Sequence, residues 1–100
     1  MKTLPFVICK KAVSDLEEIW LYTVEKWSVE QADRYYNLVF NEINYISKSS
    51  TAGKSMEHVR KSYRASKVNS HLILYRVIND TIEVIRILHE RMDMENRLND

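Results

Sequence analysis

Glycine, proline and cysteine are almost absent from this 100-residue sequence, which contains one of each. A single glycine excludes a glycine-rich phosphate-binding loop. The single cysteine, Cys9, cannot form an internal disulfide, and its apolar neighbours favour a small core residue over a reactive thiol. No apolar run approaches the roughly 20 residues of a membrane-spanning helix, and the N-terminus does not resemble a signal peptide. We therefore expect one folded domain, residues 1–100, in the cytoplasm.

Neither sign of charge dominates. The 15 basic and 14 acidic residues leave a net charge of +1, so the chain lacks the broad basic field of a nucleic-acid-binding protein and direct DNA binding is not expected. The three histidines, His58, His71 and His89, are not paired with another histidine or cysteine at a metal-binding spacing. We expect no metal and no cofactor.

Two consecutive helices are predicted in the first half of the chain. A capping box, in which a serine is followed three residues later by a glutamate or glutamine, starts each predicted helix. The two pairs are Ser14 with Glu17 and Ser28 with Gln31. Apolar residues then recur at steps of three and four, the helical period: Leu16, Ile19, Trp20, Val24 and Trp27 in the first helix, and Ala32, Tyr35, Tyr36, Val39, Ile43 and Ile46 in the second. With almost no loop between them, the helices should form a hairpin that packs on an apolar surface.

Four strands are predicted, at residues 4–9, 57–65, 71–78 and 81–88. A loop at residues 47–55 holds Gly53, for which we expect a positive φ angle, and residues 66–70 form a turn. The order strand–helix–helix–strand–strand–strand predicts an α+β fold in which the helical hairpin packs on an antiparallel sheet.

The last two strands should form a hairpin around Asn79-Asp80, which suits a two-residue turn. That turn would pair Ile78 with Thr81, Arg76 with Glu83, and Tyr75 with Val84. Alternation then assigns one face to His71, Ile73, Tyr75, Val77, Ile82, Val84, Arg86 and Leu88, and the other to Leu72, Leu74, Arg76, Ile78, Thr81, Glu83, Ile85, Ile87 and His89. Both faces are largely apolar, and a helical hairpin covers only one. The other requires the C-terminal tail, a twin subunit or a separate partner, with Met94 and Leu98 as possible anchors of the tail.

Ionisable residues gather where the last strand ends, in the run from Arg86 to Asp93. His89 could act as an acid or base, with Arg86 and Arg91 stabilising a phosphate; alternatively, it is a strand-end histidine bonded to its neighbours. Arginines 60, 64, 76, 86 and 91 could converge into a basic patch or could each be a surface residue. For Arg76, pairing with the opposite Glu83 is favoured.

Five segments of the sequence resemble the ParE branch of the RelE/ParE toxin superfamily. They are Ser-Asp-Leu-Glu-Glu-Ile-Trp at residues 14–20, Ala-Asp-Arg-Tyr-Tyr at 32–36, Val-Arg-Lys-Ser-Tyr-Arg at 59–64, Leu-Tyr-Arg-Val at 74–77, and Arg-Ile-Leu-His-Glu-Arg-Met-Asp at 86–93. The resemblance covers nearly the whole chain in order, and the closing segment is its most specific part.

The resemblance implies the toxin of a bacterial type II toxin–antitoxin pair. Its partner would be a ParD-like antitoxin with a ribbon-helix-helix DNA-binding part, forming a hetero-oligomer in which a C-terminal antitoxin segment wraps the toxin. Such a segment would supply the missing cover for the second sheet face. The antitoxin-binding candidates are Leu72, Leu74, Ile85, Ile87, Trp20 and Trp27.

Within the superfamily, ParE-like members inhibit DNA gyrase by binding, whereas RelE-like members cut mRNA on the ribosome. The chain lacks a C-terminal tyrosine, and Ser70-His71-Leu72 stands where the ribonuclease branch tends to carry an arginine; both features favour gyrase inhibition without an enzymatic reaction. The target-binding candidates are Arg60, Arg64, Arg86, His89 and Arg91. The alternatives are a ribonuclease that uses His89, Arg91 and Arg64, or a non-toxic member that only binds its antitoxin.

Overall fold

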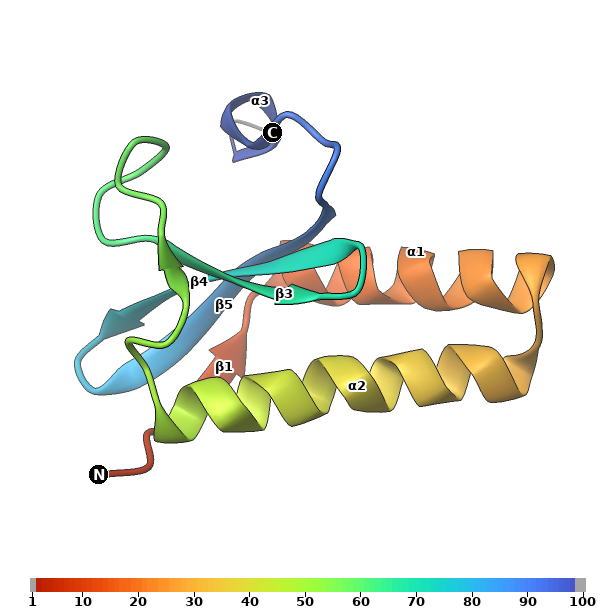
Figure 1. Cartoon of the computed structure of the whole chain (residues 1–100), viewed down its shortest axis with the longest axis horizontal. Helices are drawn as coiled ribbons and strands as arrows, with labels where there is room; N and C mark the ends of the chain where they lie inside the picture. Colours follow the sequence, from red (N-terminus) through yellow and green to blue (C-terminus); the bar gives the residue numbers. More distant parts are fainter. Residues whose placement is uncertain (1, 99–100) are drawn as a thin grey trace.

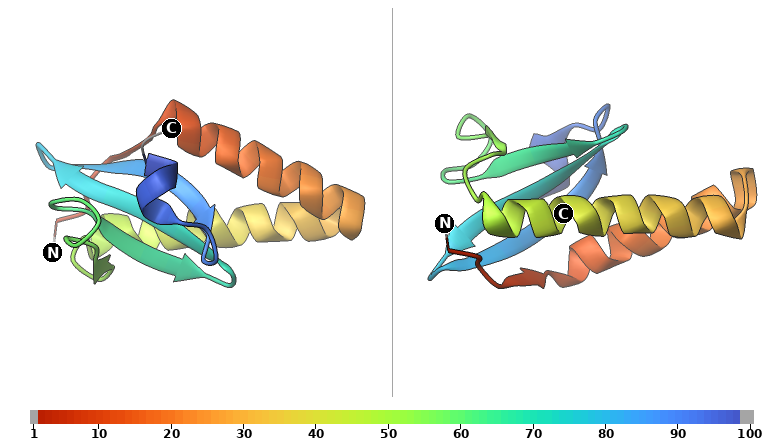
Figure 2. Two further views of the ribbon diagram at one scale, coloured as in Figure 1. Left: turned by 90° about the horizontal axis from the view of Figure 1, so that it is seen from above. Right: turned by 60° about the horizontal axis from the view of Figure 1, so that its bottom comes forward.

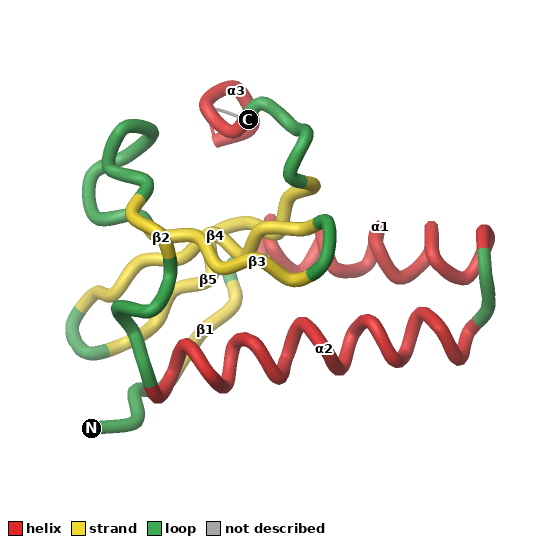
Figure 3. The backbone as a smooth tube through the Cα atoms, viewed as in Figure 1, coloured by secondary structure: helices red, strands yellow, loops and turns green. Residues whose placement is uncertain are grey.

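The computed structural model describes residues 2–98 and contains a helical hairpin packed on a five-stranded sheet (Figures 1 and 3). The elements are β1 (Phe6–Ile8), α1 (Lys10–Lys26), α2 (Val29–Lys48), β2 (Lys54–Ser55), β3 (Arg64–Val68), β4 (His71–Ile78), β5 (Thr81–His89) and α3 (Met94–Leu98). The strand order is β1-β5-β4-β3-β2. The predicted α+β class and hairpin-on-sheet arrangement are confirmed, but the sheet is mixed because β1 pairs with β5 in parallel. Among the described residues, no helix combines the length and apolarity needed to cross a membrane.

The two long helices begin differently. Helix α2 starts as predicted, since the Ser28 side chain accepts a hydrogen bond from the backbone N–H of Gln31 at 3.0 Å. The prediction that Ser14 caps α1 is wrong, because that helix already begins at Lys10 with Cys9 as its N-cap residue. The Cys9 N–H donates to the Val84 carbonyl at 3.0 Å. Pairing of β1 with β5 therefore fixes where α1 begins, and a tertiary contact overrides the local capping signal.

The main core lies between the helical hairpin and one face of the sheet. Figure 2 shows the placement of the hairpin against the sheet in two views. This first cluster consists of Ala12, Leu16, Val39, Ile43, Ile46, Val68, Ile73, Tyr75, Ile82, Val84 and Ile87. The predicted apolar stripe of α2 supplies three of its fully buried side chains, Val39, Ile43 and Ile46. The helices thus cover one apolar face of the sheet, as expected from their apolar stripes.

The opposite face of the sheet has its own smaller core. This second cluster consists of Tyr63, Ala65, Leu74, Leu88 and Met94, flanked by Met56, Val59, Leu72, Ile85 and Leu98. Helix α3 lies over this face in Figures 1 and 2. The sequence left three candidates to cover this face: the C-terminal tail, a twin subunit or a separate partner. In the structure the C-terminal tail covers it, anchored by Met94 and Leu98.

The predicted strand at residues 57–65 is wrong. Residues 57–62 form turns, in which the backbone N–H groups of Val59 and Arg60 both donate to the Met56 carbonyl. Met56, Val59 and Tyr63 reach the second cluster at helix-like steps of three and four rather than by alternation. Strand β3 follows at residues 64–68, so the predicted turn at 66–70 shrinks to Asn69 and Ser70.

Gly53 does not have the predicted positive φ angle. Its N–H donates to the Tyr75 hydroxyl at 3.0 Å, and a Cβ added at this position would lie 2.4 Å from that oxygen. Close approach of the loop backbone to a buried tyrosine, rather than a left-handed turn, is what requires glycine here.

The β4–β5 hairpin has the predicted turn but not the predicted register throughout. Asn79 and Asp80 have φ angles of 50° and 57°, and the three predicted pairs nearest the turn are confirmed. A β-bulge then shifts the pairing, so that Leu74 lies opposite Arg86 and the extra residue is Ile85. The predicted faces of β5 beyond the bulge are therefore reversed, whereas the predicted faces of β4 are retained. Ile87 packs in the first cluster and Leu88 in the second.

Candidate functional site

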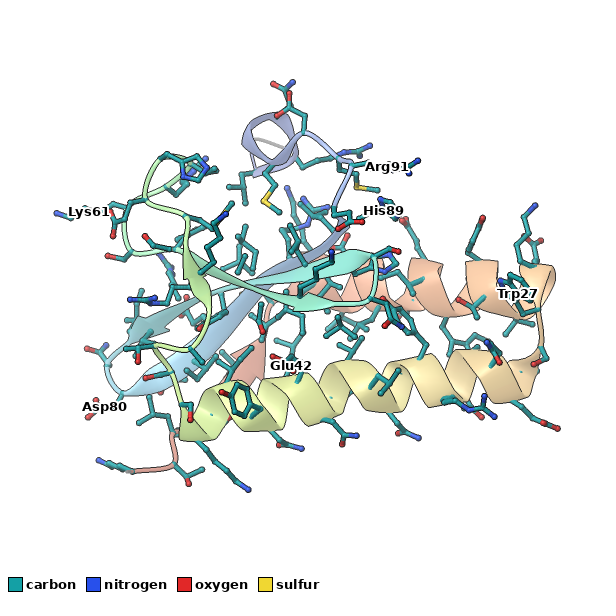
Figure 4. The ribbon with its side chains drawn as sticks, in the orientation of Figure 1. Trp27, Glu42, Lys61, Asp80, His89 and Arg91 are labelled. Atoms are coloured by element: carbon teal, nitrogen blue, oxygen red, sulfur yellow. The ribbon has the colours of Figure 1, made fainter. Side chains whose placement is uncertain are left out.

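The bulge brings two histidines together at the far end of the hairpin. Without it, His71 would lie opposite Leu88 and on the other face from His89. In the structure His71 pairs with His89, and their ring centroids are 5.4 Å apart in an edge-to-face arrangement. Both line a cleft of about 600 Å³, the histidine cleft, whose polar wall includes Asp15, Glu18 and Arg97. Figure 4 labels His89 and the neighbouring Arg91 at this end of the molecule.

Hydrogen bonds fix the protons of both imidazoles. The Tyr35 hydroxyl donates to the Val68 carbonyl at 2.9 Å and lies 2.6 Å from Nδ1 of His71. Both contacts are satisfied when His71 Nδ1–H donates to Tyr35, which leaves Nε2 as the acceptor of His71. Nδ1 of His89 accepts the Arg91 N–H at 3.1 Å, so a neutral His89 carries its proton on Nε2.

The surroundings of His71 favour its neutral form. Burial lowers the pKa of His71, and a positive charge on His89 would lower it further, against the opposing effect of Asp15 and Glu90. Burial raises the pKa of Tyr35 to about 12. His71 therefore offers its Nε2 to the cleft as a hydrogen-bond acceptor. Among the described residues, no three His, Cys, Asp or Glu side chains are grouped to hold a metal ion.

Arg86 is engaged in a buried ion pair below the histidine cleft. Its Nε and Nη2 donate to the Asp15 carboxylate at 2.8 and 3.0 Å, and its Nη1 donates to the Arg97 carbonyl at 2.8 Å. The same carboxylate accepts the Ile87 N–H at 2.9 Å, beyond the point where β1 stops pairing with β5. Asp15 and Arg86 are each 9% exposed. Arg86 therefore ties α1, β5 and α3 together, with its donors directed inward.

A second polar region, the basic segment (residues 54–64), lies on the side of the sheet that carries α3. It contains Lys54, Arg60, Lys61 and Arg64, together with His58 and one acidic residue, Glu57. Arg64 Nη1 donates to the carbonyls of Thr51 and Gly53 at 3.2 and 2.7 Å. Figure 4 shows Lys61 pointing outward at the far side of the molecule from His89 and Arg91.

The outer side of the helical hairpin carries an apolar depression of about 690 Å³, which we call the helical groove. It is lined by Ile8, Val13, Leu16, Glu17, Trp20, Leu21, Asp33, Tyr36 and Phe40. The Trp20 indole N–H donates to Asp33 at 2.9 Å, which joins the two helices across the groove. Leu21 is 58% exposed, and Trp27, at the tip of the hairpin, is 74% exposed. Exposed apolar side chains beside a groove are typical of a protein-binding surface.

The candidate target-binding residues are divided between regions. Arg86 and His89 line the histidine cleft, and Arg91 is exposed just after it. Arg60 and Arg64 belong to the basic segment. Arg64 pairs with Tyr75, four residues along β4 from His71, or about 13 Å at the usual strand rise. The structure does not bring the ribonuclease set of His89, Arg91 and Arg64 together.

The antitoxin-binding candidates are also divided. Leu74 and Ile87 are 0% and 2% exposed, on opposite faces of the sheet. Leu72 and Ile85 are half-buried beside the second cluster. Trp20 lines the helical groove, and Trp27 is exposed beyond it.

Sequence reasoning missed the partnership of His71 with Tyr35 and His89. The helical period places Tyr35 on the apolar stripe of its helix, and the predicted register separates the two histidines. A β-bulge has no dependable sequence signal when, as here, no glycine marks it. The cleft could not have been assembled from spacing alone.

Solved structures with the same fold come from toxin–antitoxin systems. The chain matches the chromosomal ParDE system from P. aeruginosa with a TM-score of 0.76 and 17% identity, over 87% of this chain and 96% of that one. It matches the RelBE2 toxin–antitoxin complex from Mycobacterium tuberculosis with a TM-score of 0.59 and 15% identity, over 87% and 98%. The chain therefore shares the fold of these two solved structures.

Sequence comparison identifies the family to which the chain belongs. The family described as the ParE toxin of the type II toxin-antitoxin system parDE matches residues 7–94, and the chain belongs to this family. Toxin ParE1 of Mycobacterium tuberculosis and Toxin ParE1 of Caulobacter vibrioides are each 34% identical to it over 94 residues, across 93% and 94% of this chain and 96% and 97% of theirs. Toxin ParE of Escherichia coli is 29% identical over 97 residues, across 95% and 93%. The resemblance drawn from the sequence is confirmed.

Proposed function

We propose that this chain arrests growth by binding DNA gyrase in the cytoplasm and that a ParD-like antitoxin neutralises it. The observation that carries the proposal is the ParE family match over residues 7–94. The site geometry supports binding over RNA cleavage. Arg86 directs its donors to Asp15 and Arg97, Arg64 directs its own to loop carbonyls, and about 13 Å of strand separates Arg64 from the histidine cleft.

The helical groove is the binding site that we propose for the antitoxin. Helix α3 already covers the second sheet face, so the partner is not needed there. The groove offers an aromatic floor and exposed leucine on a rigid hairpin, the surface that suits the apolar stripe of a partner helix. Trp20 and Trp27 thus remain the accessible antitoxin-binding candidates, in a hetero-oligomer with a ribbon-helix-helix partner.

A pair of assays with purified protein tests the choice of target. Gyrase supercoiling should fall and cleaved DNA should accumulate, while translation in a cell-free system continues. Blocked translation with cut mRNA and normal supercoiling would contradict gyrase inhibition and move His89 into a catalytic role. No effect in either assay, with antitoxin binding retained, would identify a non-toxic member.

A separate experiment tests whether the antitoxin binds at the helical groove. Leu21→Arg places a charge beside the helical groove and should weaken antitoxin binding at least tenfold, measured by calorimetry. The matched control is Tyr45→Arg, an equally exposed site on α2 that does not line the groove. Equal affinities for the two variants would show that the antitoxin binds elsewhere.

A further inference from the structure

Charge is segregated in this nearly neutral protein. The basic segment holds four Lys or Arg residues and one Glu among eleven residues, a net charge of +3. Helices α1 and α2 together hold five Lys or Arg and seven Asp or Glu, a net charge of −2. The acidic hairpin and the basic segment lie on opposite sides of the sheet (Figure 2). A local basic surface therefore exists although the whole chain carries only +1.

The basic segment is ordered before any partner arrives. The Met56 N–H donates to the Tyr63 carbonyl at 2.8 Å and closes the segment, and the Tyr63 N–H donates back to Arg60 at 3.2 Å. Met56, Val59 and Tyr63 anchor it on the second cluster. Lys54, His58 and Lys61 are left exposed. Binding through a pre-ordered segment avoids much of the entropy cost of fixing a loop.

Hydrogen bonds within the protein position this surface, and one of them engages Glu57, the only acidic residue of the basic segment. Glu57 accepts the N–H of Ser62 at 2.9 Å, where Ser62 has a φ angle of 69°. This bond stabilises a left-handed conformation that is costly for serine and holds the Glu57 carboxylate at the backbone. Arg64 similarly holds the neighbouring loop through the Gly53 carbonyl at 2.7 Å. Glu57 and Arg64 are thus positioning residues, and the lysines face solvent.

We propose that the basic segment docks an acidic stretch of the protein target. The inference rests on the proposed function and specifies which surface would meet gyrase. A protein partner fits better than nucleic acid, because a net +3 patch is small and an acidic hairpin lies behind it, whereas duplex DNA demands a broad basic field. Since the helical groove lies on the other side of the sheet, target and antitoxin would contact different faces.

The test is a charge reversal in the full chain. Lys54→Glu with Lys61→Glu should weaken binding to purified gyrase at least tenfold in 50 mM salt and reduce the salt dependence of the affinity. The matched control, Lys10→Glu with Lys11→Glu on α1, changes net charge equally at two exposed positions and should change the affinity less than twofold. Antitoxin affinity and the circular dichroism spectrum report the fold of both variants.

Two further probes separate failure of this proposal from failure of the proposed function. A 20-residue polyglutamate peptide should bind the wild type and the control variant but not the basic-segment variant, whether or not gyrase is the target. Equal losses in both variants, or no peptide binding by the wild type, would overturn the docking surface. Binding of a 30-base-pair DNA duplex that only the basic-segment variant loses, with gyrase affinity unchanged, would replace it with a nucleic-acid surface.

Discussion

The two faces of the sheet differ in the size of the core that they bury and in the elements that cover them. On the helix side, helices of 17 and 20 residues bury a cluster in which Val39, Ile43, Ile46, Ile73 and Tyr75 are all inaccessible to solvent. On the tail side, a five-residue helix and a set of turns cover a smaller cluster. Because local stability follows buried apolar contact, the helix side should determine global unfolding and the tail side should open first. Two candidate recognition elements, the basic segment and the exit of β5, border the less stable side.

Asp15 joins the two sides and gives the largest expected effect. Asp15→Ala leaves the Arg86 guanidinium buried without its carboxylate, and we expect a loss of about 3–5 kcal/mol in the free energy of unfolding. Denaturant unfolding measures it, and hydrogen exchange should also accelerate in α3, which Arg86 holds through Arg97. Asp33→Ala, which removes an exposed hydrogen bond, is the control. If Asp15→Ala costs no more than Asp33→Ala, the two sides are not joined through this ion pair.

Truncation of one core residue on each side tests the comparison directly. Ile43→Ala, at a fully buried site, should cost about 2–5 kcal/mol. Met94→Ala should cost about 2 kcal/mol or less, since α3 is short and its site can relax. Equal losses in denaturant unfolding would mean that the tail is as integral to the fold as the hairpin.

Gly53→Ala probes the loop between the two sides. A Cβ 2.4 Å from the Tyr75 hydroxyl must displace a buried ring, at a cost of about 1–3 kcal/mol. The thermal unfolding midpoint measures the effect, with the neighbouring exposed Ala52→Ser as control. An unchanged midpoint would show that the loop moves away from Tyr75 without strain.

The sequence was sufficient for elements whose signals are local. The stripe of α2, its Ser28 cap and the Asn79-Asp80 turn each depend on residues a few positions apart, and the structure has all three. Predictions failed where distant contacts decide. The start of α1 is fixed by β1 pairing, and the turns at residues 57–62 are fixed by anchoring on the second cluster.

The candidate site was only partly predictable from the sequence, because distant contacts also decide its geometry. The ionisable residues that follow β5 are evident from the sequence. The β-bulge that pairs His71 with His89 is not. Arg86 is read from sequence as a surface cation, because its carboxylate partner lies 71 residues away. A buried ion pair between distant segments leaves no periodic pattern.

The smallest expected effect is a pH dependence from His71. Burial lowers its pKa in the folded chain below the ordinary value of 6.5, so the unfolded chain binds the proton more readily. Stability is therefore complete above about pH 6.5 and should fall as the pH drops below it, until the folded-state pKa is passed, by at most about 1.4 kcal/mol per pH unit. Thermal unfolding at pH 7.5 and 5.5 measures the slope. His71→Asn keeps a donor near Tyr35 without a titrating ring and should flatten it, whereas His58→Asn, at an exposed histidine, should not. If both variants retain the wild-type slope, acid weakens the protein through its carboxylates, and the histidine cleft is not the pH-sensitive element at the end of the hairpin.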